Sequence, residues 1–127
     1  MCLIECDKLT SSEVIKSAIN VHTVLGPGLL ESVYEAAMLI ELKHNGLSVR
    51  NQISISSTYR SQDLGIAFIA DIIVEDKLVL ELKSVDSIKR IHQKQLATYL
   101  KLLNIKRGLI LNFNSSLMTD GIRQVSI

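Results

Sequence analysis

Cysteine, proline and tryptophan are scarce in this 127-residue sequence, which has two, one and none of them respectively. Cys2 and Cys6 are too few and too close to the N-terminus to form a disulfide framework, and no cluster of Cys or His completes a zinc site. We predict that both are free thiols. No window approaches 18 apolar residues, and the start MCLIECDK lacks the basic segment of a signal peptide. We therefore expect no membrane association and a cytoplasmic location.

A strong charge of one sign is also lacking, because the formal net charge is only +1. Any binding of nucleic acid must then depend on a local patch of cations. Aromatic residues make up 4% of the chain, so stacking on single-stranded bases has little support. The length predicts one domain spanning residues 1–127, which buries about two thirds of the surface that the unfolded chain exposes.

The stretch FIADIIVEDKLVLELKS at residues 68–84 is the most unusual part of the sequence. It predicts two strands joined by a tight turn, and strands so rich in Ile, Val and Leu are normally covered on both faces of a sheet. Asp71, Glu81 and Lys83 interrupt these apolar runs. A charge in such a place costs several kcal/mol unless it has a partner, so these three residues need an explanation.

The length of the turn decides whether the two acids meet. A two-residue turn at residues 75–76 pairs Asp71 with Leu80, whereas a three-residue connection at 75–77, or a bulge, pairs it with Glu81. We predict the three-residue connection. Two carboxylates about 5 Å apart repel each other by roughly 4 kcal/mol, and one lysine offsets this incompletely. A divalent cation would offset it, and oxygen ligands suit Mg²⁺ or Mn²⁺ better than Zn²⁺.

Two helices are predicted before these strands. Thr10 and Glu13 have the spacing of a capping box, and apolar residues follow at helical spacing up to Leu25, which predicts a helix over residues 11–25. The sequence Gly-Pro-Gly at 26–28 ends that helix, and a second helix is predicted over about 29–45. Glu31 and Tyr34 share one face of the second helix. A purely structural interpretation of Glu31 is that it is an acid in the first turn of the helix, where the helix dipole favours a negative charge.

The rest of the chain predicts an α/β sheet. Strands are predicted at 49–59, 64–74, 78–83, 107–113 and 121–127, with a polar turn at 56–63 and a third helix from residue 86 or 87 to about 103. In the first strand, Val49, Ile53, Ile55 and Tyr59 would share one face. The order predicts an antiparallel meander followed by a right-handed crossover, so that the strand at 107–113 lies parallel to the strand at 78–83.

The third predicted helix carries a buried stripe and a polar edge. The stripe consists of Ile88, Leu96, Leu100 and Leu103. His92, Gln95 and Tyr99 follow at i, i+3 and i+7 along its edge. They are either ordinary rim residues or part of the pocket that contains the acids, because the crossover would place them over the strand that bears Glu81 and Lys83.

An Asp followed about ten residues later by Glu-x-Lys on the next strand resembles the PD-(D/E)XK nuclease superfamily. The segments GPGLLESVYE, ADIIVEDKLVLELKSV, HQKQLATYLKLL and RGLILNFN look like its GxxExxY branch, which is named for the residues that stand here as Gly28, Glu31 and Tyr34. The resemblance covers roughly residues 10–125. Ala70 stands before Asp71 where the superfamily name has proline.

The resemblance implies a restriction-endonuclease-like αβββαβ core, with a mixed sheet flanked by helices. It implies a catalytic set of four residues, Asp71, Glu81, Lys83 and Gln95. Mg²⁺ or Mn²⁺ would be bound by Asp71, Glu81 and the carbonyl of Leu82, with Glu31 as an extra ligand. Lys83 would orient or activate the attacking water, and Gln95 would steady the substrate or the lysine. Tyr34, His92 and Tyr99 are accessory candidates.

These features predict a metal-dependent nuclease that hydrolyses phosphodiester bonds, in DNA rather than RNA. Cations near the pocket would follow a nucleic-acid backbone without reading its sequence; they are Lys83, Lys89, Arg90, Lys94, Lys101, Lys106 and Arg107. The alternative is a non-catalytic module that binds nucleic acid or protein. A third interpretation is a buried salt-bridge cluster alone. So small a nuclease would need a homodimer or a partner protein to hold its substrate, and the short final strand offers one place for a second copy to pair.

Overall fold

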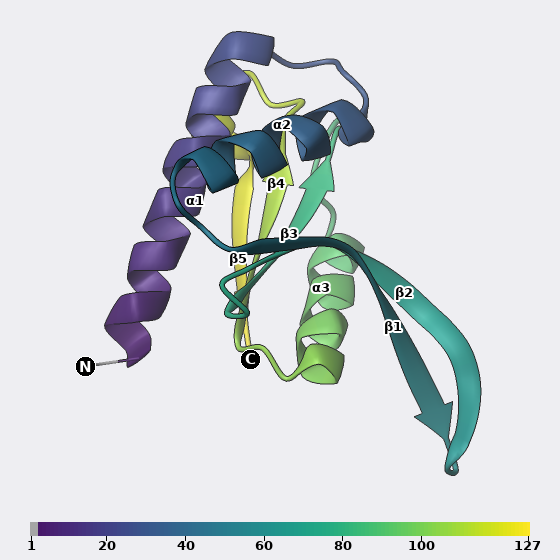
Figure 1. Cartoon of the computed structure of the whole chain (residues 1–127). Coiled ribbons are helices and arrows are strands. Elements are labelled where there is room, and N and C mark those ends of the chain that lie inside the picture. The colour runs from purple at the N-terminus through teal and green to yellow at the C-terminus, as the bar shows by residue number, and fades with distance from the viewer. Residues whose placement is uncertain (1–2) are drawn as a thin grey trace.

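The computed structural model describes the backbone of residues 3–127 and the side chains of residues 10–127. Its elements are α1 (Leu3–Leu25), α2 (Glu31–His44), β1 (Val49–Tyr59), β2 (Gln62–Val74), β3 (Leu78–Lys83), α3 (Arg90–Leu103), β4 (Arg107–Asn112), the short 3₁₀ helix η1 (Met118–Gly121) and β5 (Ile122–Ser126) (Figure 1). Cys2 and the side chain of Cys6 lie outside the described part. None of the described helices has the length and apolar character needed to cross a membrane.

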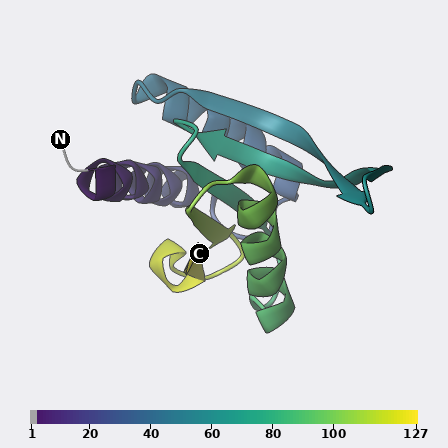
Figure 2. The same cartoon turned by 90° about the horizontal axis from the view of Figure 1, so that it is seen from below.

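The five strands form one mixed sheet in the order β1-β2-β3-β4-β5. Neighbouring strands are antiparallel except β3 and β4, which are parallel and are connected through α3. The predicted meander and crossover are therefore confirmed. Helices α1 and α2 cover one face of the sheet and α3 covers the other, which gives three layers (Figure 2).

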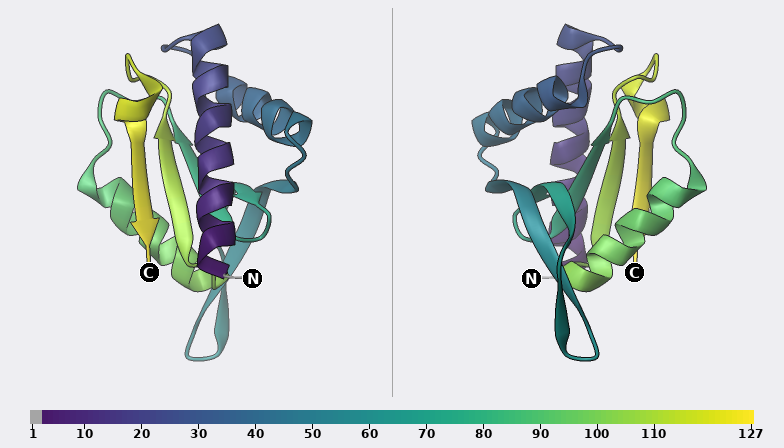
Figure 3. Two further views of the ribbon diagram at one scale, coloured as in Figure 1. Left: turned by 90° about the vertical axis from the view of Figure 1, so that its left-hand side faces the viewer. Right: turned by 90° about the vertical axis from the view of Figure 1, so that its right-hand side faces the viewer.

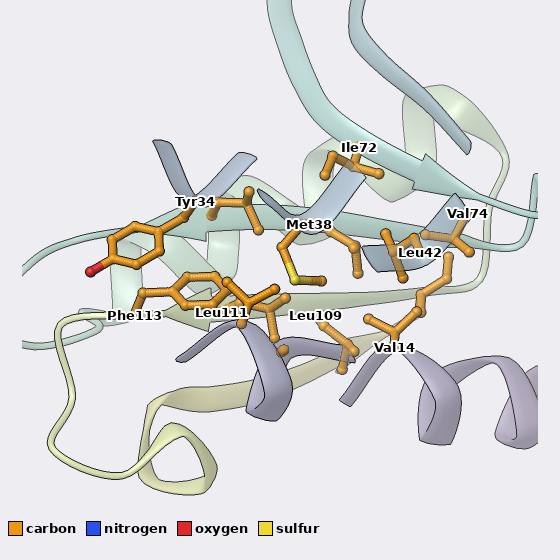
Figure 4. Packing of buried hydrophobic residues seen from close by; sticks show 14 of the residues in the cluster. Val14, Tyr34, Met38, Leu42, Ile72, Val74, Leu109, Leu111 and Phe113 are labelled. Carbon is orange, nitrogen blue, oxygen red and sulfur yellow. The ribbon is translucent and has the colours of Figure 1, made fainter. Parts of the chain in front are cut away.

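Each face of the sheet has its own apolar core. The first joins α1 and α2 to the sheet, and α2 contributes Tyr34, Met38 and Leu42 at helical spacing (Figure 4). The second lies under α3, where Leu96 and Leu100 are fully buried, as the predicted stripe requires. The strands between the two layers are covered on both faces, which explains their nearly continuous apolar sequence.

Two helices begin at different residues from those predicted. The capping-box prediction is wrong, because α1 begins at Leu3 and Thr10 lies inside the helix. Hydroxyl side chains fit a helix interior when they donate to the carbonyl four residues earlier, as Ser17 does to Glu13. Helix α3 begins at Arg90 rather than at residue 86 or 87. The buried side chain of Asn112 bonds both backbone groups of Val85, which holds this segment in a loop.

The hairpin between β1 and β2 is longer than predicted. The polar residues expected to form a turn at 56–63 are mostly in strands, and the turn itself is only Arg60 and Ser61. Both have left-handed φ values, 51° and 64°, which are typical of the two-residue turns that match strand twist. The end of the hairpin that carries this turn projects beyond the body of the molecule (Figure 3).

Strand β1 changes which face of the sheet it covers partway along its length. Val49 packs in the first core and Ile53 in the second, so the prediction that they share one face is wrong. The change occurs at Gln52, whose φ is 50°. Pairing of residue 51 with 72 and of 53 with 70 places Asp71 opposite Gln52. Asp71 therefore lies where the hairpin passes from one core to the other.

Candidate active site

The predicted meeting of the two acids is consistent with the register of β2 and β3. Ile72 pairs with Leu80, and a three-residue connection at 75–77 joins the strands, so that Asp71 and Glu81 occupy the next position along the ladder. The backbone N–H of Asp71 points to Glu81 Oε1 at 3.5 Å, and the N–H of Leu82 donates to Asp71 Oδ2 at 2.8 Å. The odd spacing predicted from sequence is confirmed.

A small hollow opens beside Asp71 at the start of α2. It has a volume of about 210 Å³ and is lined by Glu31, Ser32, Glu35, Gln52, Asp71 and Leu82. Asp71 and Lys83 are half-buried, whereas Glu81 is only 9% exposed and does not line the hollow. The site thus has one accessible carboxylate with a second one buried directly behind it.

Burial and the charges of neighbouring carboxylates disfavour the charged forms of both acids. Burial and then the neighbouring Asp71 raise the pKa of Glu81 from 4.5 to about 8. Burial also raises the pKa of Asp71; Glu35 and Glu31 add to this, while the Leu82 N–H and Lys83 act against it. Near neutral pH, Glu81 is therefore mainly protonated. One lysine does not balance the negative charge that this pair would otherwise have.

The ligand types fit a hard divalent cation that keeps part of its water shell. Carboxylate and carbonyl oxygens are the ligands that Mg²⁺ and Mn²⁺ prefer. Among the described residues, however, no group of three or more His, Cys, Asp or Glu side chains is placed to hold a metal ion. Glu31 is exposed, and its Oε1 accepts a hydrogen bond from the Ser84 N–H at 3.4 Å. A cation at Asp71 and Glu81 would need further oxygens from a backbone carbonyl, water or substrate.

Tyr34 has a structural position in this molecule. Its side chain is fully buried and stacks on Phe113 with ring centroids 4.5 Å apart. Its hydroxyl donates to the carbonyl of Gly26 and accepts from the N–H of Leu29 at 3.1 Å. Gly28, with a φ of 93°, supplies the left-handed conformation that the loop needs. Tyr34 thus fixes the loop that leads into Glu31 and does not itself line the hollow.

The three candidates on α3 differ in how closely they approach the acids. Tyr99 stacks on Phe68 at 3.6 Å between ring centroids, and burial followed by the charges of Glu81 and Asp71 raises its pKa. His92 Nδ1 accepts from the N–H of Lys89 at 3.0 Å. Burial and then the charge of Lys83, followed by that of Lys89, lower the pKa of His92. Gln95 is exposed. None of the three lines the hollow.

Residues of the hollow that the sequence reasoning missed are Ser32, Glu35 and Gln52. Glu35 follows Glu31 by four residues, so helical spacing alone indicates that the two acids share one face. The Gln52 side chain donates to Glu35 Oε1 and so connects β1 to α2. Its position results from the left-handed φ of Gln52, for which the sequence has no signal.

An α/β sheet flanked by helices, with two acids and a lysine on adjacent central strands, defines a class of nuclease-like domains. The family model of the PD-(D/E)XK nuclease superfamily matches residues 8–125. The chain belongs to this superfamily, and its five-stranded mixed sheet is consistent with the restriction-endonuclease-like fold. Nucleases of this superfamily are generally dependent on a divalent metal. No match was found among curated proteins or among solved structures.

Proposed function

We propose that this protein is a Mg²⁺- or Mn²⁺-dependent nuclease of the GxxExxY branch that hydrolyses phosphodiester bonds in DNA. The observation that carries the proposal is the adjacent pair Asp71 and Glu81, of which Glu81 is buried and Asp71 is half-buried and lines the hollow. Two carboxylates whose pKa values are raised by burial and by neighbouring acids form a site that a divalent cation would stabilise. The carbonyl of Leu82, between Glu81 and Lys83, is the proposed third protein ligand.

Each residue then has a distinct task. A bound cation would neutralise charge on the phosphate and make a nearby water more acidic. Lys83, whose charge acts on both carboxylates, would orient the attacking water and stabilise charge on the phosphate. His92, which has a lowered pKa, is kept neutral as a hydrogen-bonding group beside Lys83. Exposed Gln95 is free to contact substrate, and Glu31 on the rim is the proposed extra ligand.

Cations around the start of α3 support binding of a nucleic-acid backbone. Lys89, Arg90 and Lys94 are exposed there, and Lys83 lies at the adjoining end of β3. Charges in such a group favour contact with successive phosphates and carry no sequence information. A duplex fits this mode better than a single strand, because the chain offers few aromatic side chains for stacking.

The test is calorimetric titration of Mn²⁺ into the wild type, Asp71→Asn and Glu81→Gln, followed by cleavage assays on plasmid and linear DNA. We expect binding in the wild type and a loss of at least about tenfold in affinity in both variants. Lys83→Ala is the matched variant that should retain metal binding and lose cleavage. Binding that survives in both acid variants would refute the proposed metal site.

The non-catalytic module is the second candidate, because no third carboxylate or histidine in the described part of the chain converges with Asp71 and Glu81. It predicts that DNA binding, measured by electrophoretic mobility shift, is unchanged by EDTA and by Lys83→Ala. It also predicts no cleavage by the wild type with either cation. Metal-dependent cleavage that Lys83→Ala abolishes would exclude it.

A further inference from the structure

The part of the β1–β2 hairpin beyond Gln52 and Asp71, residues 53–70, is a two-stranded arm that no other strand flanks. Strand β2 pairs with β3 only at residues 72–74, so beyond Asp71 it has no neighbour on that side. Strand β1 is an edge strand along its whole length. The far end of the arm projects past the body of the molecule (Figures 1 and 3), whereas its inner end packs in the second core through Ile53, Ile55, Phe68 and Ala70, with Phe68 stacked on Tyr99 of α3.

The arm has the surface of a protein-binding element. Its exposed large apolar side chains are Tyr59, Leu64, Ile66 and Ile69, which are 65%, 64%, 64% and 48% exposed. Residues 51–59 of the edge strand contain no charge and no proline, although native edge strands usually carry such features to prevent pairing. Exposed apolar side chains gathered on one element mark a site of association.

Charge is placed at the two ends of β1 in a complementary way. Arg60 lies at the tip of the arm, and no side chain in the described part of the chain forms an ion pair with it. The hollow at the base is lined by Glu31, Glu35 and Asp71, together with Gln52 from β1 itself. Eight residues separate Gln52 from Arg60, which corresponds to about 26 Å of extended strand.

We propose that the arm binds a second copy of this chain by antiparallel pairing of the two β1 strands. The register we propose opposes residues 52–59 of one copy with 59–52 of the other. Arg60 of each copy then lies beside Gln52 of the partner subunit, at the rim of the acidic hollow. Each hollow therefore receives one cation from the other copy, and the exposed Tyr59 of each β1 strand lies within the paired segment.

The same observations argue against nucleic acid as the occupant of the arm. Residues 51–70 carry only two charges, Arg60 and Asp63, which have opposite sign. Binding to a phosphate backbone depends on several cations, so an arm with no net charge has little affinity for it. An apolar, uncharged edge strand is suited instead to main-chain pairing with another strand.

The first test is sedimentation equilibrium of the full chain over a range of concentrations. We expect a dimer whose dissociation constant rises about tenfold or more in the double variant Ser56→Lys/Thr58→Lys, because these exposed residues lie on β1 and four lysines would then lie in the paired segment. Val24→Lys is the matched control, since Val24 is 82% exposed on α1, away from the arm, and should leave the dimer unchanged. Unchanged thermal unfolding would show that the variants remain folded. A monomeric wild type, or a dimer that is insensitive to the arm variant, would overturn the proposal.

The position of Arg60 is tested by exchanging charges. Arg60→Glu and Glu35→Lys should each weaken the dimer, and the double variant should restore it, because the carboxylate introduced at the tip of one copy would meet the ammonium group introduced at the hollow of the other. Failure to restore it would overturn the pairing register. Arm-dependent binding of duplex DNA by a monomer would overturn the choice of occupant. The dimer does not depend on the proposed function: sedimentation needs no cleavage, so a dimer that is inactive would refute only the nuclease.

Discussion

Replacing Glu81 by glutamine measures how much an ionised Glu81, buried beside Asp71, lowers the free energy of unfolding. Glutamine resembles the protonated form of Glu81, and its amide oxygen can still accept the Asp71 N–H. The pKa of Glu81 rises from 4.5 to about 8 in the folded protein, which at about 1.36 kcal/mol per pKa unit allows an effect of at most about 5 kcal/mol. Local relaxation and water entry reduce this to a few kcal/mol.

The sign follows from proton binding. Between pH 4.5 and about 8 the folded state holds the proton on Glu81 and the unfolded state releases it, so stability falls as pH rises through this interval. The contribution of the Glu81 proton to stability is complete below pH 4.5 and absent above about pH 8. Glu81→Gln should therefore match the wild type at pH 4.5 and be more stable by a few kcal/mol at pH 9, in EDTA.

Urea unfolding followed by circular dichroism at several pH values measures this difference. Glu13→Gln, which removes an exposed carboxylate from α1, is the matched control and should follow the wild type at every pH. Addition of Mn²⁺ at pH 9 should stabilise the wild type and leave Glu81→Gln almost unchanged. Parallel stability profiles for the wild type and Glu81→Gln would refute the reasoning that the pair is strained by its own charge.

Three further substitutions test the supports of the site by thermal unfolding. Tyr34→Phe removes both hydroxyl hydrogen bonds, including the one to Gly26, and should cost about 1–3 kcal/mol; an unchanged melting temperature would contradict this. Gly108→Ala brings a Cβ within 2.9 Å of the buried Leu96 side chain and should cost about 1–3 kcal/mol; a melting temperature equal to that of the wild type would contradict this. Asn112→Ala releases the loop before α3 and should cost about 2 kcal/mol, and it should increase hydrogen exchange there; unchanged exchange would count against the role of this side chain.

The sequence was sufficient to predict the central sheet and the acid pair. Strands β1 and β3 have the predicted bounds, because apolar residues between turn signals are typical of strands whatever surrounds them. The pairing of Asp71 with Glu81 depends on one local quantity, the length of the turn at 75–77. Two charged residues in apolar strands were enough to indicate that their side chains meet.

Features set by tertiary contacts were not predictable in the same way. The loop before α3 is held by Asn112, which is 27 residues away from Val85 in the chain. The face switch at Gln52 puts a residue other than glycine in the left-handed region, and no local pattern indicates it. Glu35 was missed because helical spacing links it to Glu31 but gives no sign of the hollow between them.

The face switch at Gln52 and Asp71 also separates the site from the arm mechanically. Inside this point, the short β2–β3 ladder and α2 hold the acids in place. Outside it, the two arm strands pair only with each other, and the inner end of the arm packs in the second core through Ile53, Ile55, Phe68 and Ala70. Matched lengthening or shortening of the two arm strands therefore leaves the positions of Asp71 and Glu81 untouched. The length of the arm and the partner that it binds can therefore change, in evolution or by design, while the geometry of the acids at its base stays constant.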